Sequence, residues 1–209
     1  MSCLLYLLRH GATAANRETP YRLQGRHLDL ELDDTGRRQA QQAARALRST
    51  GLSAVYCSPL LRARETAAAI ARPHDLSPIE ESGLTEADIG QWEGKTWAEV
   101  EAEHPELYRE FLRHPGLVRY LDGESFLDVQ RRVTPLLAEL AQRHEGESIA
   151  VVSHNIVNRA VLAGLIGLPI NAARSIRQSN GGISLIEYGG HRPSVIMLNS
   201  CLHLGGDWG

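Results

Sequence analysis

Cysteine is scarce in this sequence, and the few cysteines present form no motif. The chain has three, Cys3, Cys57 and Cys201, and none of them belongs to a C-x-x-C pair. A small, odd set of isolated cysteines is typical of reduced thiols in a cytoplasmic protein. We therefore expect a cytoplasmic location and no disulfide framework.

Long hydrophobic runs are also missing. No apolar run approaches the length that crosses a membrane. Met1-Ser2-Cys3 leads directly into the first predicted strand, with neither a basic region nor a cleavage site. The sequence thus predicts no membrane segment and no signal peptide.

Lysine is nearly absent, since Lys95 is the only one among 22 basic residues. Arginine forms planar, bidentate contacts with phosphate, although such a bias more often reflects genomic base composition. The formal net charge of −3 gives no reason to expect a nucleic acid or an anionic membrane as a partner.

What remains is the composition of an ordinary globular domain. The 209 residues are 43% hydrophobic and 22% charged, and a chain of this length can bury a full core. No linker, repeat or low-complexity tract divides it. We therefore predict a single domain over residues 1–209.

Predicted strands and helices alternate along the chain. Strands are expected at residues 3–8, 53–57, 77–80, 148–152, 183–188 and 194–198. Helices are expected at residues 34–49, 60–71, 96–104, 106–113, 125–143 and 155–168, with Pro135 kinking or ending the fifth. This alternation predicts an α/β three-layer sandwich, whose mostly parallel sheet has helices on both faces. The last two strands form an antiparallel hairpin, which makes the sheet mixed.

Three predicted strands end in residues suited to phosphate. The first ends in Arg9-His10, Arg62 follows the second, and His154 follows the strand at 148–152. If these strands are parallel neighbours, their carboxyl ends meet at one edge, where open α/β sheets bind ligands. Histidine can form a covalent intermediate, and arginines neutralise a transferring phosphoryl group. Without acidic metal ligands nearby, the set predicts metal-free phosphoryl transfer to histidine.

A proton must also reach the departing oxygen. The segment Gly83–Asp88 offers two carboxyl groups, Glu86 and Asp88. Either could act as general acid and then as base for the hydrolytic water. The chemistry alone leaves both open.

Five ordered motifs join these residues: Arg9-His10-Gly11, Ser58-Pro59-Leu60-x-Arg62-Ala63-x-x-Thr66-Ala67, Leu84-x-Glu86-x-x-x-Gly90-x-Trp92-Glu93-Gly94, Gly123-Glu124-Ser125 and Val152-Ser153-His154. Together they resemble the histidine phosphatase superfamily, which includes cofactor-dependent phosphoglycerate mutases, α-ribazole phosphatases and metal-independent phosphoserine phosphatases. The resemblance runs from residue 3 to about residue 203. It implies a phosphoglycerate mutase-like fold.

The resemblance also implies roles for individual residues. His10 matches the phosphorylated nucleophile and Glu86 the proton donor, which favours Glu86 over Asp88. The other implied members of the site are Arg9, Arg62 and His154 in the phosphate pocket, and Asn16, Gln24 and Gly25 in the substrate loop. His203 in the tail is either a frayed end or part of the substrate pocket. Neither a metal nor a cofactor is implied.

The sequence departs from the family pattern where substrates are distinguished. Extra residues lie between Asn16 and Gln24, with Glu18–Tyr21 as the candidates. The tail from Leu198 to Leu204 resembles that of phosphoserine phosphatase-like members, yet Ile89 stands where those members tend to have a histidine. The similarity to that specificity is therefore partial.

These features predict a metal-independent phosphomonoesterase that hydrolyses a small phosphorylated metabolite. A lid-like helical insertion is expected at about residues 86–123, and it would narrow access for phosphoproteins. The alternative is a cofactor-dependent phosphoglycerate mutase, but residues 86–154 look short for the mutase insertion, and an open pocket favours attack by water. A further alternative is a binding module without catalytic activity. Such a module would have lost one of the site residues, and this sequence keeps them all. Phosphoserine, α-ribazole phosphate, 3-phosphoglycerate and sugar phosphates stay open as substrates, and the sequence allows a homodimer without settling the oligomeric state.

Overall fold

The computed structural model of the protein describes residues 1–190 and 192–206. Residue 191 and residues 207–209, the end of the predicted domain, lie outside the described residues. In the described part, six strands form one mixed sheet in the order β3-β2-β4-β1-β5-β6. They are β1 (Cys3–Arg9), β2 (Leu52–Cys57), β3 (Ile79–Glu80), β4 (Ser148–Ser153), β5 (Ile183–Tyr188) and β6 (Ser194–Ser200).

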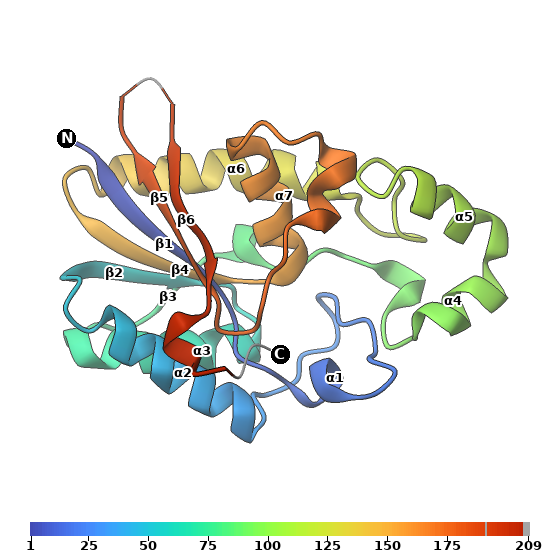
Figure 1. Ribbon diagram of the computed structural model, residues 1–209, viewed down its shortest axis with the longest axis horizontal. Helices are drawn as coiled ribbons and strands as arrows, with labels where there is room; N and C mark the ends of the chain where they lie inside the picture. Colours follow the sequence, from blue (N-terminus) through green and yellow to red (C-terminus); the bar gives the residue numbers. More distant parts are fainter. Residues whose placement is uncertain (191, 207–209) are drawn as a thin grey trace.

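Helices cover both faces of this sheet. In Figure 1, α6 (Phe126–Arg143) and α7 (Asn155–Leu165) lie above it, and α2 (Asp34–Leu47) and α3 (Leu61–Ala71) lie below. The alternation of side chains along β1 explains the two layers, because Leu5 and Leu7 pack into one apolar cluster and Leu8 into the other. The predicted mixed α/β sandwich is confirmed.

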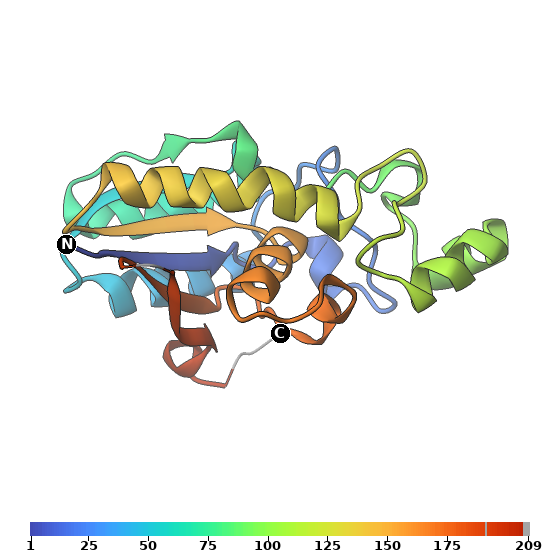
Figure 2. The ribbon, with the colours of Figure 1, turned by 90° about the horizontal axis from the view of Figure 1, so that it is seen from above.

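Short elements complete the described chain. They are the helices α1 (Ala14–Arg17), α4 (Trp97–Glu103) and α5 (Pro105–Arg113), and the 3₁₀ turns η1 (Arg72–His74), η2 (Ser82–Leu84), η3 (Gly90–Trp92), η4 (Ile170–Ser175) and η5 (Leu202–Leu204). Figure 2 shows β1 and β4 pointing toward the same edge, with α4 and α5 projecting beyond it. No helix among the described residues is both long and apolar enough to cross a membrane.

An aromatic cluster attaches the projecting helices to the rest of the fold. The ring of Trp92, which is fully buried, lies edge-on to Phe111 at 5.3 Å and to Tyr120 at 5.4 Å between centroids. Trp97 stacks on Phe111 at 5.5 Å. Edge-to-face and stacked pairs of this kind stabilise packing beyond the area they bury. These helices lie inside the insertion expected at residues 86–123, and its action as a lid stays a prediction.

Pro135 does not end its helix. Helix α6 continues from Phe126 to Arg143 with Pro135 inside it, so the alternative in which Pro135 ends the helix is wrong, and a kink there stays a prediction. Proline removes a hydrogen bond to the residue four positions earlier, here Arg131. Both residues are exposed, so water can satisfy the freed carbonyl. The buried side chains of Val133 and Leu137 hold the opposite face.

Candidate active site

The three strand ends predicted to meet are neighbours in the sheet. β4 lies between β1 and β2, and all three are parallel. Arg9 stands opposite Ser153, and Cys57 stands opposite Val152. The strands therefore stop at nearly the same level, which brings His10, Arg62 and His154 to one edge.

His10 is held so that one particular ring nitrogen faces the site. Its side chain is 3% exposed, and its Nδ1 lies 2.7 Å from the carbonyl oxygen of Gly11. A carbonyl only accepts, so Nδ1 carries the proton and the lone pair is on Nε2. The backbone around His10 is fixed too, because Gly11 N donates to Thr66 Oγ1 (3.0 Å) and Asn180 Nδ2 donates to His10 O (3.1 Å).

Buried nitrogen atoms of the residues around His10 have no hydrogen-bond partner in the described part of the chain. The ring of His154 lies 5.1 Å from that of His10 between centroids and is fully buried. Both of its nitrogens lack a partner, as do Arg9 Nε and Arg62 Nε. Buried polar groups are rarely unsatisfied in folded proteins. Arg9, Arg62 and His154 therefore offer unpaired N–H groups that suit an anion.

The backbone positions both guanidinium groups. Arg9 Nη1 donates to the carbonyl of Gln178 at 2.7 Å. Arg62, which is 1% exposed, donates to the carbonyls of Gly25 (2.9 Å) and Leu28 (3.1 Å). Carbonyl anchors do not neutralise a guanidinium charge, and the Asp29 carboxylate lies as far as 3.9 Å from Arg62, so both groups can still bind a phosphoryl group.

Burial and the arginines together keep the histidines neutral. Desolvation, followed by the guanidinium groups of Arg62 and Arg9, holds the pKa of His10 well below its ordinary value. The pKa of His154 is lowered by desolvation first and then by Arg62. Burial also lowers the pKa of Arg9 to about 10. At neutral pH the site therefore holds neutral imidazoles between cationic arginines.

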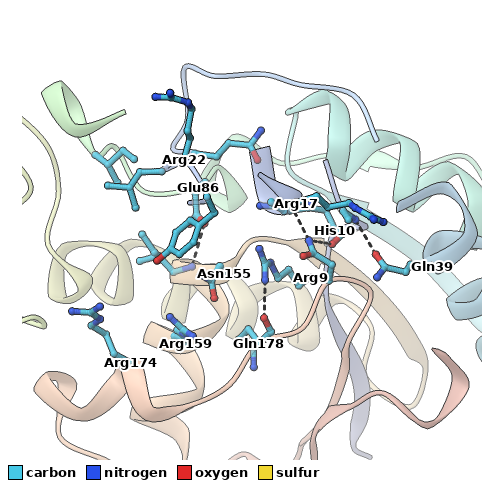
Figure 3. A pocket seen from close by; sticks show the side chains of 18 of the residues that line it. Arg9, His10, Arg17, Arg22, Gln39, Glu86, Asn155, Arg159, Arg174 and Gln178 are labelled. Carbon is cyan, nitrogen blue, oxygen red and sulfur yellow. Dashed lines mark hydrogen bonds between the residues drawn. The ribbon is translucent and has the colours of Figure 1, made fainter. Parts of the chain in front are cut away.

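A cavity of about 740 Å³ opens onto these groups (Figure 3). Several predicted site residues line it, namely Arg9, His10, Asn16, Gln24 and Glu86. Arg62 and His154 are buried and are not among the lining residues. The structure therefore places five of the predicted site residues on the wall of one chamber.

Glu86 and Asp88 occupy different positions. The Glu86 carboxylate lines the cavity and sits at the start of α7, where it accepts the backbone N–H groups of Ile156 (3.2 Å) and Val157 (3.3 Å). Asp88 is absent from the cavity wall, and its nearest basic partners are His27 (3.6 Å) and Arg26 (3.8 Å). Of the two carboxyl groups, Glu86 is the one with access to a bound substrate.

The predicted substrate-loop residues form a connected layer. Asn16 Oδ1 accepts from Asn180 Nδ2 (3.2 Å), and Gln24 Oε1 accepts from Thr13 Oγ1 (3.0 Å). Gly25 does not line the cavity, and its carbonyl instead anchors Arg62. The contact of these residues with phosphate stays a prediction.

His203 lies apart from the cavity. Its Nε2 is 3.0 Å from the carbonyl oxygen of Gly181, and its side chain is not among those lining the chamber. The structure does not bring it together with the phosphate pocket, and its contact with substrate stays a prediction.

The cavity also contains residues that sequence reasoning did not select. They are Tyr21, Trp97, Tyr120, Asn155, Arg159 and Arg174, among others. No motif marks them, because they come from separate segments that only the tertiary fold joins. For Asn155 and Arg159, the sequence does offer a signal, because both follow the predicted site residue His154 on the same helix.

No group of three or more histidine, cysteine, aspartate or glutamate side chains suited to a metal ion occurs within residues 1–190 and 192–206. The donors at this site are instead imidazole and guanidinium nitrogens with a single carboxylate. Such a set is complementary to an oxyanion.

Known proteins share this architecture. The family profile of the histidine phosphatase superfamily (branch 1) matches residues 5–200. Phosphoserine phosphatase 1 of Hydrogenobacter thermophilus is 34% identical over 201 residues, which cover 96% of this chain and 94% of that protein. Among solved structures, Bacillus stearothermophilus YhfR gives a TM-score of 0.89 at 30% identity, covering 97% of this chain and 99% of the other.

A phosphoserine phosphatase of Entamoeba histolytica, solved with 3-phosphoglyceric acid, gives a TM-score of 0.85 at 28% identity, covering 97% of this chain and 99% of the other. The fold, the order of the motifs and the profile match agree over nearly the whole length. The chain belongs to the histidine phosphatase superfamily.

Proposed function

We propose that this phosphatase is a metal-independent phosphomonoesterase that acts on a small phosphorylated metabolite through a phosphohistidine at His10. One observation carries the proposal, the fully buried His154 with both ring nitrogens unpartnered beside His10. A phosphoryl group bound beside these rings would accept hydrogen bonds from the one N–H of neutral His154 and from the free N–H groups of Arg9 and Arg62.

The first half of the reaction follows from the tautomer of His10. Its Nε2 lone pair attacks phosphorus while the bond to the ester oxygen breaks, and Arg9 and Arg62 neutralise the phosphoryl oxygens. The leaving oxygen takes a proton from the carboxyl group of Glu86. In the structure that carboxylate accepts backbone N–H groups.

The second half transfers the phosphoryl group to water. The Glu86 carboxylate removes a proton from water as its oxygen bonds to phosphorus and the P–Nε2 bond breaks, which releases phosphate and restores neutral His10. Between Glu86 and His154, the described chain forms η3, α4, α5, α6 and β4. The size of the chamber and the absence of a further enclosing helix in that interval support hydrolysis over mutase transfer.

A His10→Ala variant tests the nucleophile. We expect it to lose turnover and the acid-labile, base-stable phosphoenzyme that the wild type forms with a radiolabelled phosphomonoester. The exposed His114 provides the matched control, because His114→Ala keeps the same composition change away from the site. A labelled phosphoenzyme in the His10→Ala variant would contradict the proposal, as would a rate that EDTA abolishes and a divalent metal restores.

A further inference from the structure

Two arginines in the cavity have no part in the phosphate pocket. Arg159 comes from α7 and Arg174 from η4, and both line the chamber. Figure 3 shows them on the side of the cavity away from His10. Arg159 is among the charges that lower the pKa of Arg9, and Arg174 is among those that lower the pKa of Arg159. The positive charge thus extends outward in a row from the phosphate pocket.

Both guanidinium groups are held in place without being neutralised. Arg159 Nε donates to the carbonyl of Ile176 at 2.8 Å. The guanidinium carbon of Arg174 lies 5.4 Å from the ring centroids of both Trp97 and Phe111. An arginine packed on aromatic rings keeps the edge of its guanidinium plane free for bidentate hydrogen bonds.

Arg159 and Arg174 differ from the other arginines of the outer chamber in having no acidic partner among the described residues. The other outer arginines have acidic partners, since Arg17 lies 3.7 Å from Asp33 and Arg22 lies 3.2 Å from Glu18. Arg159 and Arg174 have no carboxylate within 4.0 Å among the described residues.

The pair also carries a cost. Burial, and then the charge of Arg174, lowers the pKa of Arg159. Two like charges that repel each other in a half-buried wall are unfavourable unless an anion binds between them.

We propose that Arg159 and Arg174 form a second anion subsite, and that the substrate is a phosphomonoester whose leaving group carries a carboxylate or a second phosphate. This inference rests on the proposed function, because it takes the phosphoryl end to be bound at His10. Tyr120 and Ile156 also line the chamber, and their apolar surfaces suit a short carbon skeleton. Substrates with one anionic group would leave the outer arginines unpaired.

Two matched substrate pairs test the subsite in the whole protein. O-phosphoserine differs from O-phosphoethanolamine by a carboxylate, and glycerol 1,3-bisphosphate differs from glycerol 3-phosphate by a phosphate. We expect kcat/KM to be about tenfold higher or more for the second-anion member of one pair, since hydrogen bonds to charged groups are strong. The pair that shows this preference identifies the anion.

Substitutions then locate the preference. Arg159→Gln and Arg174→Gln should each lower that kcat/KM ratio about tenfold, and Arg174→Lys should keep part of it because the charge remains. Arg177→Gln is the matched control, since Arg177 is exposed and lies off the cavity wall. A wild-type ratio near one for both pairs would overturn the subsite, as would a ratio that survives both glutamine substitutions. Loss of the proposed function is distinguishable, because then p-nitrophenyl phosphate would not be hydrolysed either.

Discussion

At the scale of single residues, the hydrogen bond from His10 Nδ1 to the Gly11 carbonyl determines which nitrogen can react. A carbonyl acceptor one residue away leaves Nε2 free, whatever the rest of the site does. The neighbouring arginines would repel an imidazolium, so the same arrangement that binds phosphate also keeps the nucleophile unprotonated.

The proton donor can be tested by changing the leaving group. Glu86→Gln should slow phosphoenzyme formation from an alkyl phosphate by about 100-fold or more, because an alkoxide leaves poorly without a proton. With p-nitrophenyl phosphate the loss should be much smaller, since p-nitrophenolate needs no proton to leave. Rapid-quench measurement of phosphoenzyme formation separates this step from later hydrolysis.

Asp88→Asn provides the matched control for that experiment. It makes the same carboxyl-to-amide change in the same loop, at a side chain off the cavity wall. The dependence on the leaving group should persist as in the wild type. Equal losses with both substrates in Glu86→Gln would show that Glu86 is not the proton donor.

At the scale of elements, α2 and the loop after His10 approach so closely that only glycine fits. A Cβ on Gly36 would lie 2.0 Å from the carbonyl oxygen of Ala12, and a Cβ on Gly11 would lie 2.4 Å from that of Gly36. Both clashes are with backbone, which cannot move aside as a side chain can. Helix α2 therefore packs directly against the loop after His10 and fixes its position, which we call the bracing role of α2.

Gly36→Ala should consequently destabilise the fold by about 1–3 kcal/mol and reduce kcat, because the loop after His10 must shift. Gly164→Ala is the control from another helix, as its Cβ would meet only the end of the Gln130 side chain at 2.8 Å. We expect that change to be neutral or slightly stabilising, since alanine favours helix more than glycine. Urea unfolding of both variants checks this, and equal stability of the two would refute the bracing role.

The elements themselves were largely predictable. The strands ending at Arg9 and Ser153 have buried apolar runs bounded by polar residues, and the helices have clear periodicity. Whether the helix continues through Pro135 was not predictable, because it depends on which side of α6 faces solvent. The pairing of Arg159 with Arg174 could not be predicted from the sequence either, because the two residues come together only when η4 folds against α7.

At the scale of the whole molecule, the two buried imidazoles link stability to pH. The pKa values of His10 and His154 are depressed in the folded protein by burial and by nearby arginines. The unfolded chain regains the ordinary value of about 6.5 and so binds more protons below that pH. Their contribution to stability is therefore complete above about pH 6.5 and is lost as the pH falls toward the folded-state values.

We expect the free energy of unfolding to fall on acidification by about 1.4 kcal/mol per pH unit for each ring. Urea titrations at about pH 7 and about pH 5.5 measure this change above the range where most carboxylates titrate. His154→Gln should make the pH dependence shallower, whatever its effect on absolute stability. An unchanged dependence would mean that His154 is not held neutral by the fold.

The two ends of the chamber are built from different parts of the chain. The inner end depends on the pairing register of β1, β4 and β2, which ends the three strands at about the same level. A shift of one residue in this register would displace the site residues that follow the strands. The outer wall includes Arg159 from α7, but also Arg174 from η4 and Trp97 from the insertion, and η4 and the insertion lie outside the sheet. Exchanging η4 or the insertion could therefore change the substrate preference, in evolution or by design, while the catalytic residues at the strand ends stay the same.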